Sequence, residues 1–370
     1  MGYVCFLLVL WLNILFFKKK GYFISALAFL WMAYLGWSAN PMMTFDYVAY
    51  QNIYNRTAMG INVRVEWLYT LCSKLSIRYG LTYEQFRMLF LIVVFLLLYI
   101  AIVRLTNYPA FFAGFFLIVP FFQEVTQVRS FAAYTMVLVG LSCLAKKRKR
   151  SLMIYFIAVI IAMGFHTSAG IYLMVPLVEY MIERIGLKKV FEISIWTSLL
   201  VSVVLVIFQK STLAILVIAK LIEIVAGNVI SNTFITLMGS SGGSKWYFLI
   251  IWGLYILITY LILRMMFQES LFLKEKSINV LFSVVIIGIL LCPTLLLSTQ
   301  FNRIQRFGIE VVILLMSIFA SSVNIRSTKN THLIVVTSLL VLLIGGGFYG
   351  LYSPGDSFIL SIPYLTQLQH

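Results

Sequence analysis

Long apolar runs, separated by short polar segments, make up most of the 370 residues of this chain. A helix needs about 20 mostly apolar residues to cross a bilayer, and segments of roughly this kind recur along the whole chain. The pattern predicts an all-α polytopic membrane protein with about 12 transmembrane helices in one membrane domain, residues 1–370. The predicted helices span residues 3–17, 22–38, 83–103, 108–122, 127–145, 151–165, 167–183, 190–208, 246–267, 278–298, 307–323 and 331–350.

Two longer polar stretches separate these helices, at residues 39–82 and 209–245. From Glu66 to Tyr79, apolar residues recur at helical spacing beside polar ones, which predicts an amphipathic helix lying on the membrane surface. The second stretch ends in a Gly/Ser-rich segment, residues 240–244, which is typical of a flexible lid or of a simple linker.

Composition and charge narrow the class of protein. Hydrophobic residues make up 62% of the chain and charged residues only 11%, whereas a soluble protein is about 25% charged. The net charge of +16 does not indicate a nucleic-acid partner, because basic runs such as residues 146–150 alternate along the chain as cytoplasmic anchors do. With these runs in the cytoplasm, the two polar stretches lie outside it.

Side chains that could take part in binding or catalysis lie on this outer side, and the first group is a carboxylate among tyrosines. On a helix, Asp46, Tyr50 and Tyr54 share one face and Tyr47 lies beside them, an arrangement that suits sugar binding. The alternative is a helix cap with interfacial tyrosines. Glu66 is either a further functional carboxylate or a charge that complements a helix dipole.

Cationic and imidazole side chains are expected at the same side. Arg129 begins a membrane helix, where a charge is costly without a partner or a ligand; a structural ion pair with Glu124 is the alternative. Gln127 lies between them in sequence. His166 ends a predicted helix and is either a general base or phosphate donor, or a hydrogen-bonded histidine at a helix junction.

Arg303 and Arg306 would lie side by side on a helix and repel each other unless an anion joins them, which predicts a diphosphate clamp. The alternative is an ion pair of Arg306 with Glu310. The sequence has no DxD, HExxH, Gly-rich phosphate loop or GxSxG motif. A metal-dependent transferase that uses nucleotide sugars is therefore not expected, and neither a metal nor a cofactor is predicted.

These residues lie in the segments NPMMTFDYVAYQNIY, TQVRSFAAYTMVLVGL, GFHTSAGIYL and QFNRIQRFGIE. Their order and spacing resemble the EpsG/Wzy-like polysaccharide polymerases of bacterial exopolysaccharide and capsule clusters. The resemblance implies polymerisation of oligosaccharide repeat units carried on undecaprenyl diphosphate, at the outer face of the cytoplasmic membrane. It also implies an all-α bundle, GT-C-like by analogy, and as partners the lipid-linked oligosaccharide, the bilayer, a flippase and chain-length regulator proteins.

The resemblance suggests a role for each candidate. Arg129, Arg303 and Arg306 would stabilise the diphosphate leaving group; His166, Asp46 or Glu66 would act as base; and Tyr47, Tyr50, Tyr54 and Gln127 would contact the sugars. A flippase would need ionisable residues through the membrane centre, and a ligase would use the same donor with another acceptor. Because the ionisable residues cluster on one face, the sequence favours an enzyme.

Overall fold

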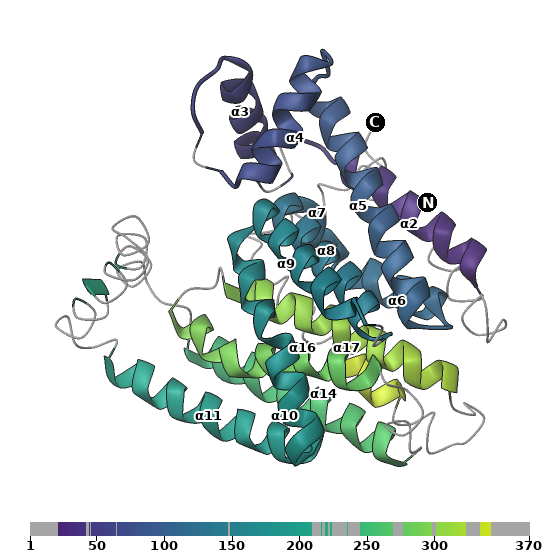
Figure 1. Ribbon diagram of the computed structural model, residues 1–370, viewed down its shortest axis with the longest axis vertical. Coiled ribbons are helices and arrows are strands. Elements are labelled where there is room, and N and C mark those ends of the chain that lie inside the picture. Colours follow the sequence, from purple (N-terminus) through teal and green to yellow (C-terminus); the bar gives the residue numbers. More distant parts are fainter. Residues whose placement is uncertain are drawn as a thin grey trace.

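The computed structural model describes residues 21–208 except 42, 43, 45, 64, 147 and 148, then residues 245–268, 277–297, 301–322 and 334–341, and the single positions 216, 219, 220, 223 and 235. Within these ranges the chain forms helices and no strand (Figure 1). The α-helices are α2 (Tyr22–Trp37), α3 (Tyr47–Ala58), α4 (Trp67–Arg78), α5 (Tyr83–Leu105), α6 (Pro109–Ile118), α7 (Phe121–Thr126), α8 (Val128–Leu144), α9 (Ser151–Phe165), α10 (Val175–Ile185), α11 (Leu187–Phe208), α14 (Lys245–Gln268), α16 (Ser277–Leu291) and α17 (Asn302–Ser322), and the 3₁₀ helices are η1 (Thr167–Met174) and η2 (Cys292–Leu296).

Five predicted helices are confirmed as α2, α5, α8, α9 and α14, each within two residues at both ends. The sequence marks the start of α5 clearly. The hydroxyl of Thr82 accepts a hydrogen bond from the backbone N–H of Gln85, and the Gln85 side chain accepts one from the Thr82 N–H. This reciprocal capping box satisfies two N–H groups that the first helical turn leaves without partners.

The amphipathic helix predicted at residues 66–79 is confirmed as α4. Its exposed face carries Trp67, Leu71 and Leu75, which repeat every four residues and are 60%, 45% and 47% exposed. Lys74 and Arg78 on the same side are exposed as well. This mixture of apolar and basic side chains suits a helix at the boundary between lipid and water.

The prediction of a single helix at residues 108–122 is wrong. The structure ends α6 at Ile118, places Val119 in an extended conformation, and starts the short helix α7 after Pro120. Proline has no N–H to donate and pushes the residue before it out of the helical region. The break gives Glu124 a place on its own short helix, fully buried in the bundle.

Three further boundaries differ from the prediction. Helix α17 begins at Asn302 rather than at residue 307, so Arg303 and Arg306 belong to its first two turns. The predicted helix 167–183 begins as the 3₁₀ helix η1 and continues as α10, and the predicted helix 278–298 ends in η2 after α16. Pro176 and Pro293 stand within the first two residues of α10 and η2, where the missing proline N–H costs no helical hydrogen bond.

Among the described helices, five are long and apolar enough to cross a membrane, at residues 83–105, 187–207, 248–267, 277–296 and 302–322. The helices at residues 22–37, 109–118, 128–144 and 151–165 are apolar but shorter. The described residues therefore support a membrane protein with several spans, and the prediction of about twelve is not confirmed.

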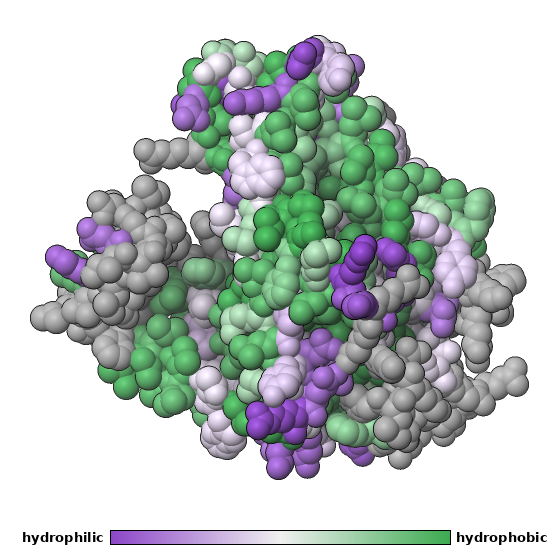
Figure 2. Space-filling model, viewed as in Figure 1, coloured by the Kyte–Doolittle hydropathy of each residue, from purple (hydrophilic) through white to green (hydrophobic). Residues whose placement is uncertain are grey.

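The helices pack in two neighbouring groups (Figure 1). In one, α5 packs against α2 and α8, and α8 runs along α9; in the other, α16 packs against α10, α11 and α17. Helix α17 is almost entirely buried and also contacts α6, which joins the groups. Helices α3 and α4 lie at one end, where α4 packs on α9. Figure 2 shows hydrophobic surface over much of the helical faces and hydrophilic residues gathered toward the α3–α4 end and around the end of α10.

Several predictions lie outside the described residues. They are the first helix at residues 3–17, most of the second outer stretch at 209–245, and the last helix beyond residue 341. Residues 334–341 are described and helical, as predicted.

Candidate active site

Glu66 and Arg129 form an ion pair between the outer segment and the bundle. Glu66 is the N-cap residue that immediately precedes α4, and Arg129 stands in the first turn of α8. The Arg129 guanidinium contacts the Glu66 carboxylate and lies 5.3 Å from the ring centre of Tyr50 and 6.0 Å from that of Tyr69. A guanidinium over aromatic faces gains a cation–π attraction as well as the ion pair. Arg129 therefore ties both α3 and α4 to the start of α8.

Arg306 is held by a second, deeper set of partners. Its Nε lies 3.1 Å from Glu124 Oε1, and its Nη2 donates to Gln127 Oε1 at 2.7 Å. Both charged side chains are at most 1% exposed. Glu310, one turn along α17, is also buried and interacts electrostatically with both of them. The sequence left open a pair of Glu124 with Arg129 and a pair of Arg306 with Glu310. In the structure Arg129 pairs with Glu66 and Arg306 with Glu124, while Glu310 still attracts Arg306 electrostatically.

His166 joins the end of α9 to α17. Its extended backbone ends α9, and its side chain turns toward both the start of η1 and α17. Nε2 lies 2.8 Å from Arg303 Nη1, Nδ1 lies 2.7 Å from Ser168 Oγ, and Ser168 Oγ lies 3.0 Å from the Tyr134 hydroxyl. Both ring nitrogens of His166 are therefore engaged, as in a positioned histidine.

The surroundings of His166 keep its ring neutral. Burial, reinforced by the positive charges of Arg303, Arg129 and Arg306, lowers the pKa of His166 from 6.5 to about 3. A buried cation without a nearby anion is unfavourable, and these arginines add repulsion. His166 is uncharged in this structure at any physiological pH.

Asp46 stands at the start of α3, in the left-handed backbone region at φ 61°. Its side chain is half-buried, and burial raises the pKa of Asp46 while the positive charges of Arg303 and Arg129 oppose that rise. Asp46 thus lies within the electric field of two of the three candidate arginines, although it is 83 residues from Arg129 in the chain.

The three tyrosines predicted to contact sugar are buried in the packing of α3. The Tyr54 hydroxyl donates to the Leu81 carbonyl at 2.7 Å, and the Tyr47 ring faces a guanidinium of α5 at 4.9 Å. Tyr50 is the one that lies beside the charged cluster, through Arg129. Gln127, also predicted to contact sugar, orients Arg306 here. A sugar-binding role for these four residues stays a prediction.

Arg87 is a residue that sequence reasoning missed. It is 2% exposed inside α5, and its Nη2 donates to the carbonyl oxygens of Gly36 at 3.1 Å and Val125 at 2.8 Å. It also faces Tyr47. An arginine inside a mainly apolar span is expensive and normally has a purpose, and this signal was present in the sequence. Arg87 fixes the end of α7, next to Glu124.

The charge balance singles out Arg303. Among the ion pairs that the described part of the chain forms, Arg129 and Arg306 each have a carboxylate partner, whereas the side chain of Arg303 bonds to a neutral imidazole. Its Nε is buried without a hydrogen-bond partner, as are side-chain amide atoms of Asn302 and Gln305 in the same turns of α17. Buried polar atoms are normally satisfied, so this turn has unused capacity to bind a polar ligand.

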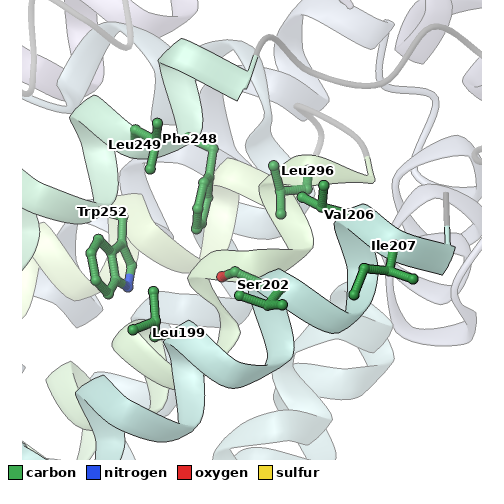
Figure 3. Close-up of a pocket in the computed structure, with 9 residues that line it drawn as sticks. Leu199, Ser202, Val206, Ile207, Phe248, Leu249, Trp252 and Leu296 are labelled. Carbon is green, nitrogen blue, oxygen red and sulfur yellow. The ribbon is translucent and has the colours of Figure 1, made fainter. Parts of the chain in front are cut away.

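A separate cavity of about 290 Å³ lies between α11, α14 and η2 (Figure 3). Its walls are almost wholly apolar, with Trp252 and Phe248 on one side and Ser202 and Ile207 on the other. The indole N–H of Trp252 donates to Ser198 Oγ at 2.9 Å. Such walls suit hydrocarbon rather than a hydroxyl-rich or anionic ligand, so the charged cluster is the candidate active site. No group of three or more His, Cys, Asp or Glu side chains in the described ranges is placed to hold a metal ion, and the expectation of a metal-free reaction stays a prediction.

Comparison with known proteins gives one match. A model of the EpsG family matches residues 21–364, which include every candidate residue of the cluster. No curated protein and no solved structure matches the chain.

Proposed function

The chain belongs to the EpsG family, and from this premise we propose that it polymerises oligosaccharide repeat units carried on undecaprenyl diphosphate. Membership indicates a glycosyltransferase-like polysaccharide polymerase. The lipid-linked substrate, the outer face of the cytoplasmic membrane as the place of reaction, and the flippase and chain-length regulators as partners belong to the proposal. The alternation of basic cytoplasmic runs supports the placement of the cluster on the outer face.

One observation carries the proposal: Arg303 has a neutral partner in a cluster whose other two arginines are paired. Arg303 stands in the first turn of α17, where backbone N–H groups and the helix dipole favour an anion. A diphosphate placed there would meet a guanidinium with an unused buried N–H. Diphosphate is the group that must be stabilised when a glycosyl diphosphate donor reacts.

The reaction needs two things from the protein. The bond between the anomeric carbon and the diphosphate oxygen breaks, its electron pair goes to that oxygen, and a hydroxyl of the acceptor forms the new glycosidic bond. Arg303, with Arg129 and Arg306 behind it, supplies preorganised positive charge for the leaving group. A base takes the proton of the acceptor hydroxyl.

The three candidate bases differ in the partners of their side chains. The carboxylate of Glu66 is occupied by Arg129, and Nε2 of His166 is occupied by Arg303. Asp46 makes no side-chain capping bond at the start of α3. Glu66 therefore fits a positioning role for Arg129, and His166 and Asp46 remain the candidates for proton transfer.

The first experiment deletes the gene in its native host and extracts the lipid-linked saccharides for sizing. The proposal expects single repeat units on the outer face and no polymer. Units held on the inner face would indicate a flippase instead, and free polymer of normal length that fails to reach its final acceptor would indicate a ligase. Complementation with the Arg303→Ala variant should leave the same unpolymerised units, and complementation with Arg78→Ala should restore polymer.

A further inference from the structure

The hydrogen bonds of His166 determine which ring nitrogen carries its proton. Arginine donates hydrogen bonds and accepts none, so Nε2 of His166 must be the acceptor for Arg303 Nη1 at 2.8 Å. A neutral imidazole then carries its single proton on Nδ1, which donates to Ser168 Oγ at 2.7 Å. The backbone N–H of Ser168 also donates toward Nδ1, at 3.3 Å, and so competes for this nitrogen. The contact of the Arg303 guanidinium with Nε2 is shorter and charge-assisted, and it decides the tautomer.

This arrangement leaves His166 without a free lone pair. A general base accepts a proton through an unoccupied nitrogen, and the only basic nitrogen of the ring points at a guanidinium. Ser168 is itself positioned by the Tyr134 hydroxyl at 3.0 Å, and the Tyr134 ring stacks on Phe307 of α17 at 5.0 Å. The tautomer is therefore fixed from one side by η1 and α8, and the basic nitrogen is covered from the other by α17.

We propose that Arg303 is a positioning residue that keeps His166 from acting as a base until the diphosphate of the donor binds. The anion draws the guanidinium away from Nε2, and the freed nitrogen then accepts the proton of the acceptor hydroxyl. Ser168 and Tyr134 hold the ring so that Nε2, rather than Nδ1, is the nitrogen set free. This inference rests on the proposed function, because it assumes a diphosphate donor.

Bond strengths favour the exchange. A guanidinium binds a phosphate through two parallel hydrogen bonds in which both partners are charged, whereas its single bond to a neutral imidazole has charge on the donor only. Among the described side chains, Arg303 hydrogen-bonds to a neutral acceptor, while Asp46 and Glu124 attract it electrostatically without forming an ion pair with it. The cost of breaking that bond is thus smaller than the gain from the new ones.

The charges around His166 also favour its action as a base after the donor binds. The groups that face it are Arg303 and Arg306 from α17, Arg129 and Tyr134 from α8, and Ser168 from η1. Burial and, after it, the charges of the three arginines depress the pKa of His166, and a bound diphosphate offsets the part that is due to the arginines. The pKa of His166 then rises toward its ordinary value of about 6.5, which makes the ring a stronger base once the donor is in place.

Histidine NMR of the full chain in nanodiscs tests this inference directly. His332 and His370, the other two histidines, are changed to Gln so that one ¹⁵N-labelled ring remains, and the probe is inorganic diphosphate. Without diphosphate we expect the Nδ1–H tautomer and no titration down to about pH 4. With diphosphate present we expect the midpoint to rise by at least about one pH unit, a tenfold gain in proton affinity.

Variants separate the parts of the inference. Arg303→Met should raise the midpoint without any diphosphate and remove the response to it, while Arg303→Lys should keep the midpoint low because the charge remains. Arg78→Met, the same change at an exposed residue of α4, should behave like the parent protein. An unchanged midpoint in Arg303→Met, or an Nε2–H tautomer in the parent protein, would overturn the Arg303–His166 coupling.

If diphosphate does not change the titration midpoint of His166 in the parent protein, then diphosphate does not release His166 from Arg303, and this part of the inference is wrong. These readouts do not depend on polymer formation. Failure of the proposed polymerase function would therefore show in the sizing of lipid-linked saccharides, and failure of this inference would show only in the NMR titration.

Discussion

Arg303 Nη1 lies 2.8 Å from His166 Nε2, although 137 positions separate the two residues in the chain. The contact joins the first turn of α17, the most buried of the five candidate membrane spans, to the junction of α9 and η1. It puts a permanent cation against an imidazole ring whose ordinary pKa of about 6.5 lies near neutrality. The predictions below follow from this contact and from the ion pairs around it.

Arg303→Ala should reduce the rate of polymer formation by about 10²–10³-fold, the usual cost of removing one preorganised donor from a developing negative charge. The protein should still insert and fold, because the carboxylates that Arg303 attracts, Asp46 and Glu124, keep the charges of Arg129 and Arg306 beside them. The measurement is polymer length and rate with a lipid-linked repeat unit. Arg78→Ala is the control, and polymer of normal length in Arg303→Ala would remove Arg303 from the anion site.

Arg306→Gln should destabilise the protein more than Glu124→Gln. Losing Arg306 leaves two buried carboxyl groups, Glu124 and Glu310, without their cation, and breaking a buried pair costs about 3–5 kcal/mol. After Glu124→Gln, Glu310 still lies beside Arg306. Thermal unfolding in detergent should show this order, with the double variant less destabilised than the sum of the two. Equal losses of stability in the two single variants, or a double variant whose loss is their sum, would contradict this prediction.

Stability should fall in acid partly because of His166. The ordinary pKa of 6.5 drops to about 3 in the folded protein, so between these values the unfolded chain binds more protons and unfolding becomes easier as pH decreases. His166 thus favours the folded state fully above pH 6.5 and progressively less toward pH 3. The slope is at most about 1.4 kcal/mol per pH unit. In His166→Gln the melting temperature should depend less steeply on pH between 6.5 and 4, and an unchanged slope would refute the depressed pKa.

Arg87→Met should destabilise the protein by about 1.5–3 kcal/mol, the range for a hydrogen bond from a charged group. Its loss strands the carbonyl oxygens of Gly36 and Val125 and loosens α7 beside Glu124. Arg104→Met is a matched control, because Arg104 is exposed at the other end of the same helix. Thermal unfolding and polymer assays should separate the two variants, and equal effects would show that burial of Arg87 is not what matters.

Gly164→Ala should disturb the packing of α4 on α9. A Cβ added at Gly164 would lie 2.8 Å from Leu68 Cβ and 2.9 Å from the Trp67 ring, so α4 must shift, and with it Glu66. Gly253→Ala is the control, since its Cβ would meet nothing within 4 Å. We expect slower polymer formation in the first variant only. Equal rates in both would mean that the position of α4 does not govern the Glu66–Arg129 pair.

Much of the secondary structure was readable in the sequence because a membrane demands long apolar segments with their backbone hydrogen bonds satisfied internally. Helices α2, α5, α8, α9 and α14 were located within two residues, and the amphipathic α4 followed from its apolar repeat. The break at Val119–Pro120 was missed because apolar residues continue on both sides of the proline. The periodicity of hydrophobic residues does not report such a break, although the proline itself does.

The residues of the candidate site, apart from Arg87, could also be identified from the sequence. Their order along the chain indicated the family. Charged residues within apolar segments are few, and each of them needs a partner or a ligand. The sequence alone therefore limits the number of candidate site residues. It does not assign the partners, because its natural guesses are local ones, Glu124 with Arg129 and Arg306 with Glu310. Only the tertiary structure paired Arg129 with Glu66, Arg306 with Glu124 and Arg303 with His166. These contacts join residues 63 to 182 positions apart, and their distances are set by how whole helices pack, which no local pattern of residues encodes.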